Sequence, residues 1–187
     1  MEYSIHIISG NNKIGKTANI SLPPVISCRK LPCNKECYAI KLYKWGHVAR
    51  VAWDANLKLA QENREAYFTM IRRHLLRATP EYFRWHVSGE ILDQEYLNQM
   101  KKIAFDFFFV SFLVYTKQYS FDFSDTPNNL TVILSAWPGV EMPHTALPLA
   151  FIETDTRAFN TFECEGKCET CRKCWGLRNK NVVLKKH

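Results

Sequence analysis

The residues best suited to chemistry in this chain are its seven cysteines, which fall into two segments. The tail segment, Cys164 to Cys174, has the spacing C-x3-C-x2-C-x2-C, and the leading segment, Cys28 to Cys37, has the spacing C-x4-C-x3-C. Two residues between cysteines let both sulfurs face one centre, as zinc and iron–sulfur sites require. Four thiols among Glu, Lys and Arg do not suit an apolar core. A metal centre is therefore the first interpretation, with reduced thiols or disulfides as the alternative.

Two arrangements of the metal ligands are compatible with the spacing. In one, the tail cysteines form a self-contained zinc knuckle and the leading three are separate; in the other, the two segments meet and share an iron–sulfur cluster. Four ligands are expected per cluster, with the last three cysteines favoured. The candidates are Cys28, Cys33, Cys37, Cys164, Cys168, Cys171 and Cys174.

The leading cysteines also bear a weaker resemblance to another class of protein. They follow a predicted strand and precede a predicted helix, and radical S-adenosylmethionine enzymes have three cysteines in a comparable position. The spacing in those enzymes is C-x3-C-x2-C, whereas here it is C-x4-C-x3-C. Radical chemistry is therefore an alternative function.

A second polar constellation lies at the ends of two predicted strands. Residues 82–90 alternate as a strand that places Arg84, His86 and Ser88 on one face and ends in Ser-Gly-Glu. Polar side chains are costly in an ordinary core, but in a barrel this face points inward and the strand end opens into the active site. An edge strand with one wet face is the alternative. The predicted catalytic residues are His86, Ser88, Glu90, Tyr115 and Lys117, and hydrolysis of an ester or phosphoester, with His86 or Glu90 as general base, is the favoured reaction.

The segment from Gly10 to Thr17 matches the phosphate-binding pattern G-x4-G-K-T. That loop needs a following helix whose amides hold the phosphates. Pro23 and Pro24 come too soon for such a helix. The segment is therefore interpreted as a hairpin turn.

Hydrophobic periodicity predicts the elements that position these residues. A long amphipathic helix is expected over 47–77, broken near Asp54, and a second follows an N-cap at Asp93. Strands are expected at 3–8, 82–90, 107–115, 130–137, 147–153 and 181–187. Because a full eight-fold barrel takes about 250 residues, the prediction is an α/β fold of one domain, 1–187. It is an abbreviated TIM-like (β/α) barrel closed by a cysteine-ligated metal centre, where segments 28–37 and 164–174 meet.

Composition and charge restrict the class of protein. A hydrophobic share of 47% indicates a folded chain. The stretch 107–115 is about half of the roughly 20 residues that a membrane helix needs, so no membrane partner is expected. With no export signal, the cysteines indicate a reducing, cytoplasmic location. The net charge is +7, and the excess of Lys and Arg after Cys164 indicates possible contact with nucleic acid.

Several motifs, taken in order along the chain, resemble the bacteriophage gene-product-eighty-eight family. They are Asn11-x-Lys13-x-Gly15-Lys16, Ser21-Leu-Pro23, Cys28/Cys33/Cys37-Tyr-Ala, Arg84-x-His86-x-Ser88-Gly89, Tyr115-Thr116-Lys117 and Cys168-x2-Cys171-x2-Cys174-Trp. The resemblance implies a phage-encoded protein with a cysteine-ligated metal and a barrel-like fold, acting in the host cell.

This resemblance, together with the excess of cysteines over four, favours a [4Fe-4S] cluster over zinc. We therefore expect a phage iron–sulfur protein that hydrolyses a small-molecule ester or phosphoester. The alternatives are a radical S-adenosylmethionine-type enzyme and a non-catalytic, metal-stabilised protein that binds nucleic acid or a host factor.

Overall fold

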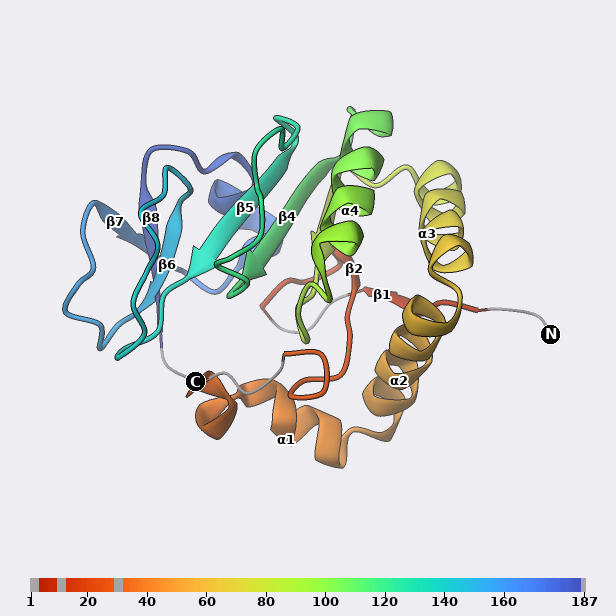
Figure 1. Cartoon of the computed structure of the whole chain (residues 1–187), viewed down its shortest axis with the longest axis horizontal. Coiled ribbons are helices and arrows are strands. Elements are labelled where there is room, and N and C mark those ends of the chain that lie inside the picture. Colours follow the sequence, from red (N-terminus) through yellow and green to blue (C-terminus); the bar gives the residue numbers. More distant parts are fainter. Residues whose placement is uncertain (1–3, 10–12, 29–31, 186–187) are drawn as a thin grey trace.

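A computed structural model describes residues 4–9, 13–28 and 32–185 of the chain. Within these residues the centre of the molecule is an eight-stranded sheet with the order β1-β2-β3-β4-β5-β6-β8-β7 (Figure 1). The strands are β1 (Ile7–Ser9), β2 (Ala18–Ile20), β3 (Tyr82–Trp85), β4 (Ser111–Thr116), β5 (Leu130–Ser135), β6 (Leu149–Ile152), β7 (Thr161–Glu163) and β8 (Asn181–Leu184). β1 pairs antiparallel with β2, and the other neighbouring strands pair parallel. The predicted α/β class is confirmed.

Helices connect β2 to β3 and β3 to β4, whereas loops alone connect β4 to β5 and β5 to β6. The helices are α1 (Tyr38–Trp45), α2 (His47–Glu62), α3 (Arg64–Ala78), α4 (Gln94–Asp106) and α5 (Cys168–Cys171), with 3-10 turns η1 (Pro32–Glu36) and η2 (Lys173–Gly176). The helix expected over 47–77 is two helices, and the break falls at Asn63 rather than Asp54. Asn63 leaves the helical conformation at φ −148°, and its side chain accepts a hydrogen bond from the Ala66 amide, which caps α3.

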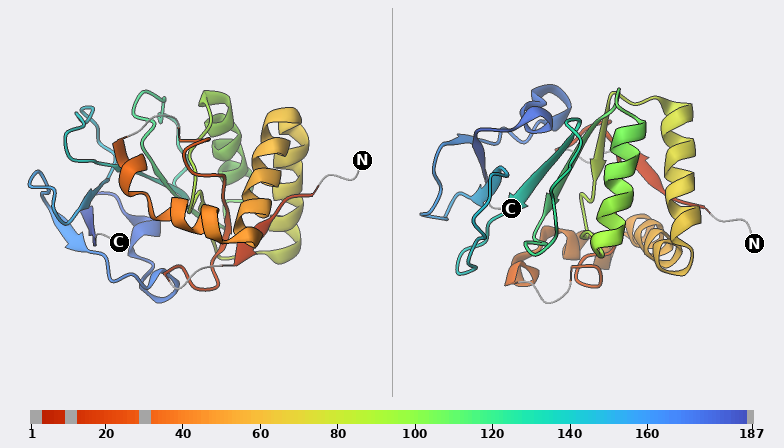
Figure 2. Two further views of the ribbon diagram at one scale, coloured as in Figure 1. Left: turned by 90° about the horizontal axis from the view of Figure 1, so that it is seen from below. Right: turned by 45° about the horizontal axis from the view of Figure 1, so that its top comes forward.

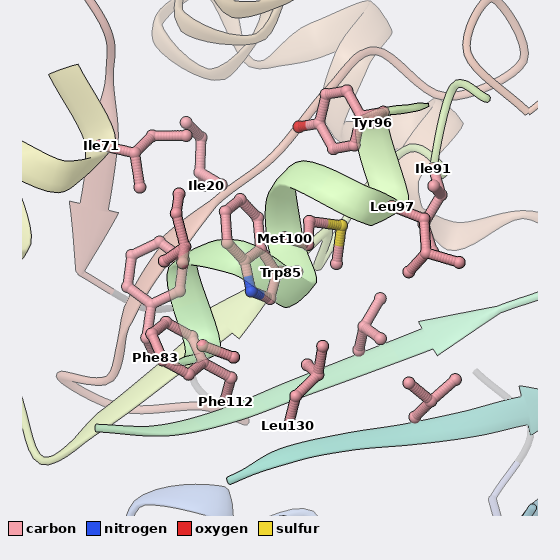
Figure 3. Packing of buried hydrophobic residues seen from close by; sticks show 14 of the residues in the cluster. Ile20, Ile71, Phe83, Trp85, Ile91, Tyr96, Leu97, Met100, Phe112 and Leu130 are labelled. Carbon is pink, nitrogen blue, oxygen red and sulfur yellow. The ribbon is translucent and has the colours of Figure 1, made fainter. Parts of the chain in front are cut away.

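One face of the sheet packs against α3 and α4. Figure 3 shows Phe83, Trp85 and Phe112 from neighbouring strands gathered beside Met100 of α4, and all four side chains are fully buried. Each such side chain contributes roughly 1.5–3 kcal/mol by leaving water. The predicted N-cap of α4 is confirmed, because the Asp93 carboxylate accepts from the Tyr96 amide at 2.8 Å.

The opposite face is covered by the tail of the chain. Leu113 and Ile133 of the central strands pack with Val182, Trp175 and Leu177 in a second, smaller core. In Figure 1 the short helical turns of the tail lie behind β4 and β5. Coverage on both faces explains why β5 is apolar along almost its whole length, as buried parallel strands are.

The predicted closure into a barrel is not shown. β1 and β7 stand at the two ends of the strand order, and no pairing joins them among the described residues. Figure 2 shows the same separation of the two ends from two further directions. The tail instead reaches the turn before β2: the Cys168 amide donates to the Lys13 carbonyl at 2.8 Å, and Arg172 donates to the Thr17 hydroxyl at 3.0 Å.

The turn before β2 confirms the hairpin interpretation of the glycine-rich motif. β1 and β2 pair antiparallel on either side of it, although residues 10–12 lie outside the described residues. Gly15 has φ +58°, and a Cβ there would lie 2.0 Å from the Glu169 carboxylate. The tail therefore needs glycine at this point of the turn.

All six predicted strands have different bounds in the structure, and the largest differences are in β3, β4 and β1. β3 ends at Trp85 rather than residue 90, because His86 turns the chain with φ +51°. β4 starts at Ser111 rather than residue 107, because the Asn129 side chain donates to three carbonyls at the end of α4 and in the following turn. β1 starts at Ile7, with residues 1–3 outside the description, and β7 was not predicted.

Candidate active site

A cavity of about 560 Å³ opens at the carboxyl ends of the parallel strands. In Figure 1 the arrowheads of β4 and β5 point toward the side of the molecule where α1 lies, and Cys37, Tyr38 and Ala39 from the start of α1 line the cavity. Ligands of open α/β sheets characteristically bind at this edge, where loops from several strands meet. The cavity is therefore the first place to look for chemistry.

The cavity brings together the five predicted catalytic residues and the three leading cysteines. From these two sets the lining residues are Cys28, Cys33, Cys37, His86, Ser88, Glu90, Tyr115 and Lys117. The tail cysteines do not line it. The meeting of segments 28–37 and 164–174 in one site, predicted from the sequence, is not what the cavity shows.

Backbone and hydroxyl hydrogen bonds fix the loop after β2 against the loop after β3. The Leu22 amide donates to the Ser88 carbonyl at 3.0 Å, and the Glu90 amide donates to the Ser27 hydroxyl at 3.2 Å. Gly89, at φ +85°, lies so close that a Cβ would stand 2.7 Å from the Leu22 carbonyl oxygen. Cys28, next to Ser27, is thus held in a fixed position relative to Glu90.

Glu90 is buried and its carboxylate is fully engaged. It accepts from the Thr116 hydroxyl at 2.6 Å, the Lys117 amide at 2.8 Å and the Ile91 amide at 2.9 Å. Burial raises the pKa of Glu90, and these three donors act in the opposite direction. The carboxylate therefore fixes the end of β4 beside the cavity, and its role as a general base stays a prediction.

His86 and Ser88 are buried but have unused hydrogen-bonding capacity. They are 3% and 4% exposed, and among the described residues neither the His86 ring nitrogens nor the Ser88 hydroxyl finds a partner. Burial lowers the pKa of His86 to about 3, so the imidazole is neutral at physiological pH. The ring lies 5.5 Å from that of Tyr96. His86 and Ser88 both line the cavity, although these three polar atoms are themselves covered by protein.

The leading cysteines are half-buried free thiols. Burial raises the pKa of Cys28 to about 11, with Glu90 and Cys37 adding to the effect. Burial also raises the pKa of Cys33, and the charge of Lys117 lowers it. Because metals bind the thiolate, loading this site would release protons. Lys117, whose ammonium lies 6.0 Å from the Trp137 ring, would help to balance the new negative charge.

Tyr115 connects the cavity with the tail. Its hydroxyl donates to the Cys174 sulfur at 3.1 Å, and the Arg84 guanidinium lies 4.9 Å from its ring. Burial raises the pKa of Tyr115 well above its ordinary value, and the nearby Cys174 thiolate would raise it further. Tyr115 and Arg84 line the cavity on one side and contact the cysteine-rich tail on the other.

The metal itself remains a prediction. Across residues 4–9, 13–28 and 32–185, no group of three or more His, Cys, Asp or Glu side chains is already arranged to hold a metal ion. The donor set nevertheless fits: three thiols share one cavity with a cation and no disulfide joins them. All-thiolate surroundings suit iron–sulfur clusters and zinc alike.

Three of the seven basic residues of the tail have contacts within the fold. Arg172 stacks 4.1 Å from the Tyr82 ring, and Lys173 pairs with Glu165 at 2.7 Å. Arg178 donates to the Asn128 and Leu177 carbonyls and to a threonine hydroxyl. These contacts give the tail charges structural roles, which leaves fewer of them for nucleic acid.

A family model described as Gene product 88 matches residues 6–139. The chain belongs to this phage family. The match contains the leading cysteines and all five predicted catalytic residues, and it ends before the tail cysteines, although the resemblance seen in the sequence extended to them. No curated protein and no solved structure matches the chain.

Sequence reasoning missed several cavity residues of this family member. Arg84 was placed on the correct strand but given no role, and Trp137 was treated only as the end of a strand. Trp137 could have been found from its place in the chain, because it comes two residues after the end of β5 at Ser135 and the ends of parallel strands meet at one edge of the sheet. Arg157, after β6, is not one of the lining residues, but it donates to the Trp137 carbonyl at 2.7 Å, a contact between distant segments that the sequence could not show.

None of the helices in the described ranges is long and apolar enough to cross a membrane.

Proposed function

We propose that this Gene product 88 protein is a radical S-adenosylmethionine-type enzyme whose [4Fe-4S] cluster is bound by Cys28, Cys33 and Cys37. One observation carries the proposal: of the seven cysteines, these three line the strand-end cavity, on the loop that follows the first parallel strand. Three thiolates on a four-iron cluster leave one iron without a protein ligand. The wider spacing, C-x4-C-x3-C, requires a longer loop around the cluster than in the enzymes it resembles.

Cys28, Cys33 and Cys37 would hold the cluster. Once reduced by an external one-electron donor, it would supply the electron that cleaves a C–S bond of S-adenosylmethionine into methionine and a deoxyadenosyl radical, which would take a hydrogen atom from the substrate. The chain's own residues bind and orient the reactants. Arg84 and Lys117 supply positive charge for a ligand carboxylate. Ser88 and neutral His86 supply hydrogen-bonding groups that nothing in the described protein uses. A reducing cytoplasm of the host cell is the compartment in which this chemistry would proceed.

The test is anaerobic purification, reconstitution with iron and sulfide, and reduction with dithionite in the presence of S-adenosylmethionine. Deoxyadenosine and methionine should form in equal amounts, as measured by mass spectrometry. The Cys33→Ser variant should lose this activity, whereas Ser120→Ala, on an exposed turn, should keep it. Wild-type protein that carries a reducible four-iron cluster and yields no deoxyadenosine would refute the proposal.

Hydrolysis of an ester or phosphoester is the second candidate function. It is favoured by a neutral imidazole and an unpartnered serine hydroxyl in the same cavity. A hydrolase of this kind would work without a reductant, and His86→Ala would abolish turnover of chromogenic esters or phosphoesters without loss of metal. Turnover that persists in His86→Ala would exclude this site.

A further inference from the structure

We infer that the tail quartet, Cys164, Cys168, Cys171 and Cys174, forms a second metal centre: a closed tetrathiolate site for a thiophilic divalent cation of the zinc class, independent of the cavity. This inference goes beyond the proposed function and does not depend on radical chemistry. Of the two arrangements that the sequence left open, it selects the self-contained tail site over the shared cluster.

The resolved interactions between cysteines fall within each of the two groups. Cys174 belongs to the second, smaller core on the face opposite α3 and α4, together with Leu113 and Ile133. Cys164 and Cys168 pack against this core. Cys174 interacts electrostatically with Cys164 and Cys168, and Cys168 also with Cys171. Cys28 and Cys33 each interact in the same way with Cys37. No interaction resolved within the described ranges links a leading cysteine with a tail cysteine.

The backbone of the tail brings its four cysteines from several directions to one region. Cys168 and Cys171 stand at the two ends of the single turn α5, where the Cys171 amide donates to the Lys167 carbonyl at 2.9 Å. Arg172 then reverses the chain at φ +54°, so that Cys174 lies in η2. Cys164 follows β7, and its amide donates to the Val183 carbonyl of β8 at 2.8 Å. Successive tight turns that present thiols are the ordinary frame of structural zinc sites.

The frame is anchored to the sheet without any metal. The Thr131 hydroxyl donates to the Trp175 carbonyl at 2.6 Å, and Trp175 is buried. Arg172 stacks on the rings of Tyr82 and Trp175, at 4.1 Å and 5.5 Å. The backbone is thus held at both ends, and closure around an ion would come from rotation of the thiols between staggered rotamers. Such rotation is required, since they do not yet form a site as they stand.

Outer groups suited to thiolates surround the quartet. The Tyr115 hydroxyl donates to the Cys174 sulfur at 3.1 Å, and the charge of Arg84 acts on both Cys168 and Cys174. Donors to ligand sulfurs orient the ligands and stabilise their charged form. A quartet of thiols that merely filled an apolar core would need neither. Tyr115, predicted as a catalytic residue, is thus assigned to this centre as a positioning residue.

The experiment compares two triple variants of the full chain. One replaces Cys28, Cys33 and Cys37 by Ser, and the other replaces Cys168, Cys171 and Cys174 by Ser. Each is stripped of metal anaerobically and titrated with Co²⁺, whose absorption reports tetrahedral thiolate ligands. The leading-triple variant should bind one Co²⁺ per chain with this absorption, which one equivalent of Zn²⁺ should displace.

Two results would overturn the inference: a leading-triple variant that binds no Co²⁺, or one that assembles an iron–sulfur cluster in place of the single ion. The tail-triple variant tests independence, because it should still take up iron and sulfide at the leading cysteines. If it does not fold, the Co²⁺ titration of the leading-triple variant decides alone.

The Tyr115→Phe variant, made in the leading-triple background, tests the role of the hydroxyl. Loss of its hydrogen bond to Cys174 should shift the sulfur-to-cobalt charge-transfer band. The matched control is Tyr119→Phe, because the Tyr119 hydroxyl donates to the Ser135 carbonyl and not to a cysteine. Identical bands in both variants would contradict the assignment of Tyr115.

Discussion

The buried, neutral His86 makes the stability of the protein depend on pH in a defined window. Its pKa is about 3 in the folded protein, against an ordinary value of 6.5 for the unfolded chain. Between these values the unfolded chain binds a proton that the folded protein does not. Lowering the pH through this window therefore favours unfolding. The cause is desolvation of the ring, which is 3% exposed.

The magnitude follows from the two pKa values. From pH 7 to pH 5 the His86 contribution should lower the free energy of unfolding by about 2 kcal/mol, with a limit of about 5 kcal/mol below pH 3. With a typical dependence on denaturant, a loss of about 2 kcal/mol lowers the urea midpoint by roughly 1 M.

The assay is urea unfolding of the wild type and of His86→Gln at pH 7 and pH 5, followed by tryptophan fluorescence. Glu90, whose raised pKa acts in the opposite direction, and the cysteines are present in both proteins, so their contributions cancel in the comparison. The wild type should lose about 2 kcal/mol more than His86→Gln between the two pH values. Equal losses in both proteins would refute the burial of a neutral imidazole at this position.

Three further predictions concern the loops and the tail. Gly89→Ala should lower the free energy of unfolding in urea by about 2–4 kcal/mol, because alanine disfavours the positive φ and its Cβ would press against Leu22. The control is Gly139→Ala, at φ +77° with no atom within 4 Å of the added Cβ, which should show only the loss due to the positive φ. Equal losses in the two variants would contradict the close contact at Gly89. Asp155→Asn should lower the free energy of unfolding in urea by about 1–3 kcal/mol, because the buried carboxylate, 2% exposed, forms a 2.7 Å ion pair with Arg157 that the amide cannot form. The control is Glu165→Gln, which should be nearly neutral because the ion pair of Glu165 with Lys173 is exposed. Because Arg172, Lys173 and Arg178 are engaged within the fold, fewer tail cations remain for phosphates, and single-stranded DNA should be released by about 150–200 mM salt in fluorescence anisotropy. Tight binding at that salt would support the nucleic-acid hypothesis.

The elements whose local pattern agrees with their packing could be predicted from the sequence. The apolar run 130–135 is β5, and Asp93 caps α4. Both could be predicted because a buried strand and a helix cap each leave a pattern in a few consecutive residues. The cavity residues at the ends of β3 and β4 followed from the rule that parallel strands end at one edge. These inferences needed only periodicity and turn residues.

What the sequence did not predict depends on contacts between distant segments. His86 adopts positive φ because the loop after β3 is bound to the loop after β2, about 65 residues earlier, through bonds such as that between Ser88 and Ser21. The sequence left open whether the tail cysteines lie beside Cys28 to Cys37; in the structure Cys164, Cys168 and Cys174 belong to or pack against the smaller core that contains Trp175 and Leu177. Hydrophobic periodicity shows that a segment is buried without showing which face it covers.

The position of the tail has a consequence for the order in which the chain folds during synthesis. The face of β4 and β5 opposite α3 and α4, called here the inner face, is covered by residues 174–182. Arg172 bonds to Thr17 across a sequence separation of 155 residues. A chain emerging from the ribosome can therefore pack α3 and α4 on one face early. It leaves Leu113 and Ile133 in water until the last residues appear. A ribosome that stalls before residue 174 would release a chain whose core under α3 and α4 is native but whose inner face is uncovered. Such a chain would be prone to aggregation and proteolysis.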